Sequence, residues 1–233
     1  MKTNNDIEPI KKNETINNHR GVLAVVSGFS GAGKGTLMKE LVNRYHNYAL
    51  SISATTRDPR DGEMEGREYF FKTHEEFEKM IAQEEFIEYA MYVDHYYGTP
   101  REYVERHLND GDDVILEIEM QGALTVKKKF PEAILLFIVA PSLSELKARL
   151  GKRGTESIAV IEARLKRALE EADVTDSYDY IIVNDDLEAC VKEVHSIIQG
   201  EHNDLDLSRE KLRNRRVIAD FKAELEADIL KQK

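Results

Sequence analysis

A glycine-rich loop near the start of the chain has the clearest chemical consequence of any segment in this sequence. It reads Gly28-Phe29-Ser30-Gly31-Ala32-Gly33-Lys34-Gly35-Thr36. Glycines at this spacing let backbone N–H groups surround a polyphosphate, and the lysine adds a mobile positive charge. The apolar run over 22–26 and the amphipathic stretch over 36–45 place the loop between a buried strand and a helix. The loop therefore predicts a nucleotide-binding site rather than an ordinary glycine turn.

A pair of arginines further along the chain could bind a second phosphate. Arg57 and Arg60 are three residues apart, and Tyr69 follows them. Two guanidinium groups can hold a phosphate monoester through charge-assisted hydrogen bonds, and a tyrosine hydroxyl can donate a third. By itself such a pair is usually part of a solvated loop. In a chain that already carries a phosphate-binding loop, it favours a site for a phosphorylated acceptor.

The residues around these motifs predict alternating strands and helices. The expected strands cover 22–26, 49–53, 67–72, 86–93, 114–119, 133–140 and 180–184. The expected helices cover 36–45, 73–83, a stretch from 99, 122–129, a stretch from 142, 156–172 and 185–199. Thr73 and Thr99 would open their helices through capping boxes. Continuous apolar strands between helices indicate a parallel sheet with helices on both faces, which is an α/β fold.

Several motifs, in order along the chain, resemble those of guanylate kinases. They lie at 51–63, 66, 69, 86–89, 96–99, 117–122, 153–156 and 182–186. The resemblance implies a P-loop NTPase-type core over 21–200, with a small inserted GMP-binding β-lobe over about 51–99 and a short helical lid over about 149–164. It also implies ATP-dependent phosphorylation of GMP to GDP, a reaction of purine nucleotide metabolism with ATP and GMP as small-molecule partners.

Polar side chains of the inserted lobe, together with Glu119 beyond it, fit the pairing edge of guanine. Guanine presents N1–H and N2–H2 donors beside an O6 acceptor. Glu88 and Glu119 can accept from the donors, and Ser53 or Thr99 can donate to O6. Adenine has an acceptor at N1 and a donor at N6, so the same residues would leave its polar groups unpaired. The set therefore favours guanine.

The resemblance assigns residues to each part of the site. The GMP-binding residues are Ser53, Arg57, Arg60, Tyr69, Glu88, Tyr97, Thr99, Glu117 and Glu119. The ATP-binding residues are Gly28, Ser30, Gly31, Ala32, Gly33, Lys34, Gly35, Thr36 and Asn184. The catalytic residues are Lys34, Arg57, Arg149, Arg153 and Arg164. Relatives often carry aspartate at 117 or 119, so which of the two glutamates contacts guanine and which lies near magnesium stays open.

Basic residues of the implied lid could spread positive charge over a transferring phosphoryl group. Arg149, Arg153 and Arg164 match lid arginines by resemblance, and Arg167 lies one turn beyond the last of them. Each alone would be an ordinary exposed arginine. Together they predict a lid that closes over ATP and excludes water. No residue need act as a covalent nucleophile, because the GMP phosphate itself attacks ATP.

Magnesium is the cofactor that this chemistry implies. The seven histidines and the single cysteine show no metal-ligand spacing. Mg²⁺ should therefore arrive with ATP, held mostly by phosphate oxygens and water. The residue after Lys34 is Gly35, where this type of loop usually has Ser or Thr, and a hydroxyl follows at Thr36. Thr36 is the residue we assign to the metal.

Composition limits the other functions. A chain of 233 residues with a net charge of −11 suits a single core and argues against binding nucleic acid. No stretch approaches the ~20 consecutive apolar residues that span a membrane. Residues 1–20 form a polar tail without a signal core. The lone Cys190 suits a reducing compartment and is typical of a small buried apolar residue. A cytoplasmic protein is expected.

The segment 201–233 extends past the resemblance as a charged helix. Val217, Phe221, Leu225 and Ile229 recur at four-residue spacing and form one apolar stripe. Such a stripe could dock on the body or on a second subunit of a homo-oligomer. We favour an appended surface helix, and expect deletion of 203–233 to spare catalysis.

Two other functions share these motifs. A kinase of a sugar phosphate could use the same fold, but the guanine set argues against it. A guanylate-kinase-like domain could instead bind a phosphorylated partner without catalysis. Such domains usually have a degraded phosphate-binding loop, whereas Lys34 is present here. The motifs therefore favour the ATP:GMP phosphotransferase.

Overall fold

A five-stranded parallel sheet forms the centre of the fold. The computed structural model describes residues 20–151 and 158–231. The strands are β1 (Leu23–Gly28), β2 (Tyr48–Leu50), β7 (Asp113–Glu117), β8 (Ile134–Val139) and β9 (Tyr180–Val183). Their order is β2-β7-β1-β8-β9, and every pairing is parallel. The apolar strands are buried because helices cover both faces, which confirms the α/β fold.

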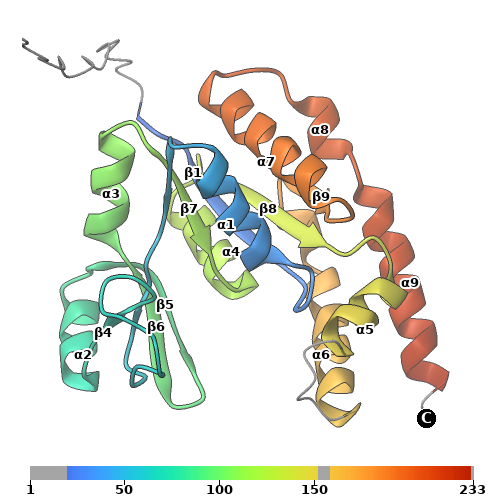
Figure 1. Cartoon of the computed structure of the whole chain (residues 1–233), viewed down its shortest axis with the longest axis horizontal. Coiled ribbons are helices and arrows are strands. Elements are labelled where there is room, and N and C mark those ends of the chain that lie inside the picture. The colour runs from blue at the N-terminus through green and yellow to red at the C-terminus, as the bar shows by residue number, and fades with distance from the viewer. Residues whose placement is uncertain (1–19, 152–157, 232–233) are drawn as a thin grey trace, which may run out of the picture.

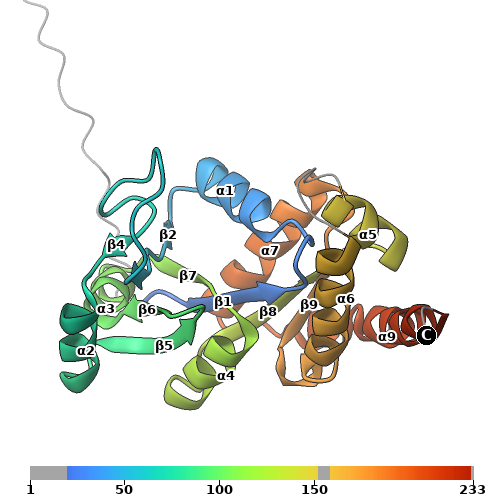
Figure 2. The same ribbon diagram turned by 90° about the horizontal axis from the view of Figure 1, so that it is seen from below.

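Helices pack on both sides of this sheet. They are α1 (Lys34–Arg44), α3 (Arg101–Asn109), α4 (Met120–Lys129), α5 (Leu143–Gly151), α6 (Ile158–Ala172) and α7 (Leu187–His202). Figure 2 shows α1 and α7 on one face and α4 on the other. Gly28 ends β1 and has φ +149°, and a Cβ there would lie 2.1 Å from the Ile138 carbonyl oxygen. Only glycine lets the loop turn out of the sheet so close to β8.

A second sheet forms a small lobe beside the core. It contains β3 (Ala54–Thr55), β4 (Phe70–Phe71), β5 (Phe86–Tyr92) and β6 (His95–Pro100), in the order β4-β3-β6-β5, with α2 (His74–Ala82) packed on it. The ring of Phe77 stacks on Phe86 at 4.3 Å and on Tyr96 at 5.1 Å, so the lobe has its own aromatic core. Figure 1 shows this lobe set apart from the helices α5, α6 and α9.

The two capping boxes expected from the sequence have different outcomes. Thr73 caps α2 as predicted: its hydroxyl accepts from the Glu76 N–H, and the Glu76 carboxylate accepts from the Thr73 N–H. Thr99 does not cap a helix, because β6 continues to Pro100 and α3 begins at Arg101. The buried Thr99 hydroxyl donates instead to Glu88.

The C-terminal segment is docked on the body of the chain. It forms α8 (Ser208–Leu212) and α9 (Arg215–Lys231), and α9 lies along α5 and α6. Phe221 and Leu225 are 3% and 0% exposed. Of the two docking surfaces that the sequence left open, the buried residues of the apolar stripe are covered by the body of this same chain. Helix α9 is shown in red beside α5 and α6 in Figure 1. Over the described ranges, no helix is long and apolar enough to cross a bilayer.

Candidate active site

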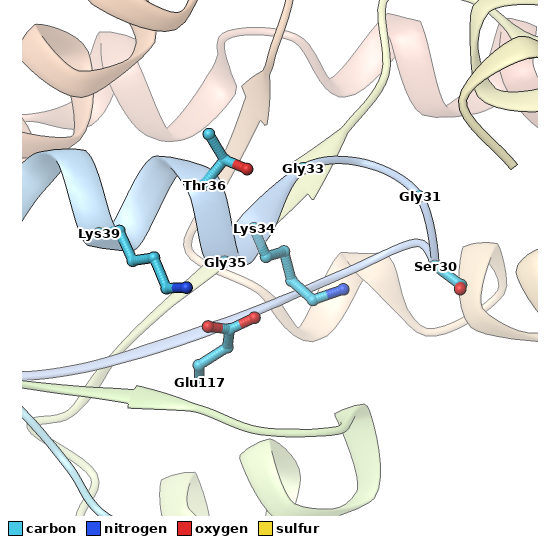
Figure 3. Close-up of a pocket in the computed structure, with 8 residues that line it drawn as sticks. All are labelled: Ser30, Gly31, Gly33, Lys34, Gly35, Thr36, Lys39 and Glu117. Atoms are coloured by element: carbon cyan, nitrogen blue, oxygen red, sulfur yellow. The ribbon is translucent and has the colours of Figure 1, made fainter. Parts of the chain in front are cut away.

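A cavity of about 320 Å³ opens over the glycine-rich loop at the carboxyl end of β1. Figure 3 shows the residues that line it, from the loop, from α1 and from the end of β7. They are Ser30, Gly31, Gly33, Lys34, Gly35, Thr36, Lys39 and Glu117. Ligands of parallel α/β sheets bind at the carboxyl ends of the strands, where this cavity lies. The lining matches the predicted phosphate-binding loop and adds Lys39 to it.

Lys34 is held by the loop that it is expected to serve. Its Nζ donates to the carbonyl of Gly28 at 2.6 Å and to that of Phe29 at 3.3 Å. Gly33 is the N-cap of α1 and has φ +92°, so the backbone turns sharply just before the lysine. The ammonium group therefore lies at the positive end of the α1 dipole, where a polyphosphate is stabilised.

Glu117 and Thr36 differ in their surroundings. In Figure 3 the Glu117 carboxylate lies between the side chains of Lys34 and Lys39, while the Thr36 hydroxyl points away from it. Burial raises the pKa of the Glu117 carboxyl, and the two lysines oppose that rise. A Cβ added to Gly35 would lie 3.8 Å from Oε1 of Glu117, so a Ser or Thr at position 35 would face the Glu117 carboxylate. The glycine keeps that space open.

Arg149 and Asn184 meet behind the loop. Arg149, on α5, donates to the carbonyl oxygens of Ala32 at 3.3 Å and of Asn184 at 3.0 Å. The buried Asn184 side chain donates to the same Ala32 oxygen at 2.8 Å. Asn184 thus fixes the shape of the loop from β9, because its amide nitrogen is already directed to the loop backbone. Arg149 and Asn184, which were assigned to the site separately, are thus in contact although they lie far apart in the chain.

The other implied lid arginines lie on or before α6. Arg164 donates to the Ser30 hydroxyl at 3.2 Å, which brings it to the rim of the loop. Arg153 falls outside the described residues, as does part of the implied lid over 149–164. Two of the three implied lid arginines therefore contact the phosphate-binding loop from two different helices. That arrangement concentrates positive charge where a triphosphate would lie.

Arg57 in the small lobe is oriented by an acidic partner. Its guanidinium donates to both carboxylate oxygens of Glu63, at 2.9 and 2.8 Å, and to the Asp58 carbonyl at 2.6 Å. The Arg60 N–H also donates to Glu63, at 2.8 Å, while the Arg60 side chain is exposed. Hydrogen bonds from Arg60 and Arg57 lower the pKa of the Glu63 carboxyl, so Glu63 is ionised and holds the loop in shape.

Two tyrosines complete this arginine site. The Arg57 guanidinium lies 5.4 Å from the centre of the Tyr69 ring, and the Tyr69 and Tyr97 rings are 6.1 Å apart. Burial raises the pKa of the Tyr69 hydroxyl, so it stays a neutral donor. The structure thus brings Arg57, Tyr69 and Tyr97 together, with Arg60 on the adjoining exposed loop. These are donors of the type that binds a phosphate monoester.

Glu88 is a buried carboxylate in the small lobe. It is 7% exposed, and its Oε1 accepts from the Thr99 hydroxyl at 2.7 Å. A Cβ on Gly122 would lie 2.9 Å from Oε2, so the glycine in α4 makes room for the carboxylate. Burial raises the pKa of the Glu88 carboxyl, while Thr99 and the charge of Lys129 oppose the rise. Ala54, directly after Ser53, pairs with Gly98, directly before Thr99, so Ser53 and Thr99 lie at the same end of the two strands.

Glu119 is exposed, unlike that buried pair. It directly precedes α4 and is 75% exposed, and its Oε2 is 2.5 Å from the Arg167 guanidinium. Arg167 also donates to Glu171 at 3.1 Å, so α6 is linked to the end of β7. Glu117 and Glu119 therefore face different surroundings, the first beside Lys34 and Lys39 and the second beside Arg167 of α6.

Three side chains at this site were not assigned to it from the sequence. Glu63 orients Arg57, Lys39 flanks Glu117, and Glu171 shares the Arg167 guanidinium with Glu119. Lys39 lies five residues after Lys34 on the same helix, which is not the three- or four-residue spacing that places side chains on one face, so no spacing rule indicated it. Glu63 was visible only as part of a motif, because a carboxylate that orients an arginine has no spacing rule of its own.

Comparisons with known proteins show which family this chain resembles. The family model described as guanylate kinase matches residues 20–201. The guanylate kinase of Caldanaerobacter subterraneus subsp. tengcongensis is 49% identical over 191 residues, which cover 82% of this chain and 93% of that protein. The guanylate kinase of Bacillus anthracis is 52% identical over 188 residues, or 80% and 92% of the two chains.

A solved structure agrees with these sequence matches. The crystal structure of guanylate kinase from Anaplasma phagocytophilum has a TM-score of 0.63 and 33% identity. The alignment covers 78% of this chain and 87% of that one. The matched residues 20–201 contain the glycine-rich loop, the small lobe and the arginines of α5 and α6, whereas α8 and α9 begin after the family model ends. On this basis, the chain belongs to the guanylate kinase family.

Proposed function

We propose that this protein transfers the γ-phosphoryl group of ATP to GMP and releases ADP and GDP. One observation supports the proposal: two clusters of side chains of the type that binds phosphate are formed by different parts of the chain. The first is the loop with Lys34, Arg149 and Arg164, and the second is the lobe with Arg57 and Tyr69. A phosphotransferase needs a donor site and an acceptor site, whereas a binding domain needs one of them.

The acceptor base is selected by carboxylates. Glu88 is buried beside the Thr99 hydroxyl, and Ser53 lies at the same end of the strand pair. In this proposal Glu88 and Glu119 accept from the guanine N2–H2 and N1–H donors. Ser53 or Thr99 donates to O6. The N1 acceptor of adenine would face a carboxylate, and neither group would then have a hydrogen-bond donor to pair with.

The chemistry needs no covalent intermediate with the protein. An oxygen of the GMP phosphate forms a bond to the γ-phosphorus of ATP, and the bond from that phosphorus to the β–γ bridging oxygen breaks. Lys34 and the arginines stabilise the charge that moves onto the leaving oxygens. Arg57, Arg60, Tyr69 and Tyr97 hold the acceptor phosphate in line. Closure of α5 and α6 over ATP excludes water, so that transfer to GMP outcompetes hydrolysis.

The site also fits a magnesium ion that enters with ATP. In the described part of the chain, no group of three or more His, Cys, Asp or Glu side chains could hold a metal. Hard oxygen donors are nevertheless present in the cavity, at Thr36 and Glu117. A bound Mg²⁺ would neutralise β- and γ-phosphate oxygens. We assign Thr36 to the metal and place Glu117 next to the phosphates, where it orients Lys34 and Lys39.

A cytoplasmic location belongs to the same proposal. Cys190 is buried in α7, and burial raises the pKa of its thiol to about 12, so it is an unreactive packing residue. The proposed substrates, ATP and GMP, are available in the same compartment.

The test is an assay of ADP release with ATP and one nucleoside monophosphate at a time. GMP should support turnover at least about 100-fold faster than AMP, CMP or UMP, because those bases leave polar groups of the site unpaired. Lys34→Met, purified in parallel, measures the contaminating background. Equal turnover with all four monophosphates would contradict the guanine site. Turnover with a sugar phosphate and none with GMP would contradict the proposed reaction.

A further inference from the structure

The C-terminal helix contacts the phosphate-binding loop from behind. Phe221 of α9 stacks on Phe29, a residue of the loop, with ring centres 5.1 Å apart and planes at 27°. Phe29 in turn meets the edge of Phe137 on β8, at 5.1 Å and 85°. The Phe29 ring is fully buried between the sheet and the added helix. The loop residue therefore has one aromatic neighbour from the shared fold and one from the extension.

The backbone of Phe29 connects this packing to the active site. Its carbonyl accepts from the Lys34 ammonium at 3.3 Å and from the Ala32 N–H at 3.0 Å. Its own N–H donates to the Ile138 carbonyl at 3.3 Å. A shift of Phe29 that extends to its backbone would therefore move an acceptor that defines the loop. Phe221 lies outside residues 20–201, which the family model matches, yet it packs on Phe29 of the phosphate-binding loop.

The same helix also holds both helices that carry the implied lid arginines. On α5, Lys147 pairs with Asp228 of α9 at 2.5 Å. At the end of α6, Asp173 pairs with Lys222 of α9. Figures 1 and 2 both show α9 running beside α6. Helix α5 carries Arg149, and helix α6 carries Arg164. Helix α9 therefore contacts the loop, α5 and α6, which are the three elements that surround the proposed triphosphate.

The start of α9 is anchored independently of these contacts. Arg215 donates to the carbonyls of Thr175, at 3.0 Å, and of Tyr178, which lie in and after the short 3-10 helix Thr175–Ser177. Asn214 donates to the Ile181 carbonyl at 3.0 Å, on the edge strand β9. The helix is thus attached to the rigid sheet at one end. That attachment lets it act as a brace rather than as a mobile tail.

We propose that α9 is a positioning element of the ATP site, and that Phe221 is the positioning residue that holds Phe29 and, through its carbonyl, Lys34. Phe221 touches no substrate in this proposal. Its removal should loosen the ATP side and leave the GMP side unchanged, because the lobe with Arg57 and Glu88 is separate from α9. The kinetic part rests on the proposed phosphoryl transfer, whereas ATP binding can be measured without it.

The experiment compares full-length variants of α9. Phe221→Ala, Phe221→Leu, Leu225→Ala and the exposed control Glu224→Ala are each characterised by melting temperature, by the Kd for a fluorescent ATP analogue, and by KM for ATP and GMP. Phe221→Ala should raise the Kd and KM for ATP by about 10-fold or more, since small misplacements at a site are costly in binding and rate. KM for GMP should change by less than about twofold. Phe221→Leu, which keeps a large apolar side chain, should retain most of the ATP affinity that Phe221→Ala loses.

The controls separate positioning from general stability. Leu225 is as buried as Phe221 but lies one turn further along α9, so Leu225→Ala should lower the melting temperature without the same loss of ATP binding. An equal ATP defect in Leu225→Ala at the same loss of stability would overturn the role of Phe221. So would folded Phe221→Ala with Kd and KM for ATP within about twofold of the wild type.

A double substitution tests the route through Phe29. If Phe221 acts through that ring, Phe221→Ala should have little further effect on ATP binding once Phe29→Leu is present. Additive losses would contradict the route. Absence of turnover in the wild type, with ATP binding still weakened by Phe221→Ala, would reject the proposed reaction and keep the positioning role.

Discussion

The Glu119 carboxylate is held at 2.5 Å by the guanidinium of Arg167, which also reaches Glu171. One residue of the implied guanine set is therefore paired with a residue of the lid-side helix α6. Glu119 is 75% exposed, so this ion pair contributes at most about 1 kcal/mol. A hydrogen bond from guanine N1–H can replace it, because the competing pair is weak.

Glu119→Gln is expected to lower kcat/KM for GMP by about 30- to 1,000-fold, which corresponds to about 2–4 kcal/mol. The amide keeps the shape but turns an NH2 group toward the N1–H donor of guanine. KM for ATP should stay unchanged, since the loop lies elsewhere. Arg167→Leu is the matched control and should change KM for GMP by less than about fivefold. A loss as large in Arg167→Leu as in Glu119→Gln would mean that the ion pair, and not guanine recognition, explains the effect.

Lys34→Met should fold normally and lose at least about 100-fold in kcat, because its charge is most effective when negative charge shifts onto the β–γ bridging oxygen. The methionine side chain is one atom shorter and keeps most of the apolar stem, but it loses the hydrogen bonds to the Gly28 and Phe29 carbonyls. Circular dichroism and the melting temperature establish that the variant is folded. Near wild-type turnover in that protein would exclude the role assigned to Lys34.

The core and the loop could be predicted from the sequence because each rests on local patterns. Apolar runs predicted β1, β7 and β8, and the glycine spacing predicted the turn between β1 and α1. The assignment of Thr99 as a helix cap failed because the same hydroxyl had a buried carboxylate within reach. Local sequence contained the capping pattern, whereas the competing partner Glu88 came from another strand.

The C-terminal helix shows the same limit more clearly. The spacing of Phe221 and Leu225 predicted an apolar stripe, but nothing in the spacing tells which surface covers it. The contact of Phe221 with Phe29 joins residues that are far apart in the chain. The expected dispensability of 203–233 for catalysis stays a prediction. Glu63 and Lys39 were not assigned to the site for a related reason, since each acts on a partner rather than as a member of a motif.

Gly122→Ala should impair GMP use while leaving the fold intact. A Cβ at this position would lie 2.9 Å from Glu88 Oε2 and 3.2 Å from Ile118 Cδ1, so the carboxylate must move. Alanine favours the helix by up to about 1 kcal/mol over glycine, which offsets the crowding in stability. We expect kcat/KM for GMP to fall about 10-fold with little change in KM for ATP. Thr125→Ala, exposed on the same helix, is the control and should behave as wild type.

Glu88→Gln should stabilise the protein at neutral pH while it weakens GMP recognition. Burial raises the pKa of the Glu88 carboxyl in the folded chain, despite the Thr99 hydroxyl and the charge of Lys129. A carboxyl with a raised folded-state pKa favours folding most when it is protonated, and that contribution is lost as the pH rises through the folded-state pKa. A glutamine at position 88 stays neutral, so the variant does not lose this stability as the pH rises. Its melting temperature should therefore exceed that of the wild type at pH 7 to 8.

The difference should shrink as the pH falls toward about 4.3, the ordinary pKa of glutamate, because the wild-type carboxyl is then also neutral. Thermal melts of both proteins from about pH 4.5 to 8 measure this closing gap. The exposed Glu85→Gln, on the turn before β5, should change the melting temperature little at any pH. In parallel, kcat/KM for GMP should drop in Glu88→Gln by about 30-fold or more, while KM for ATP is retained. A variant that is less stable than the wild type at pH 8, or equally active with GMP, would show that Glu88 is a structural anion and not part of the guanine site.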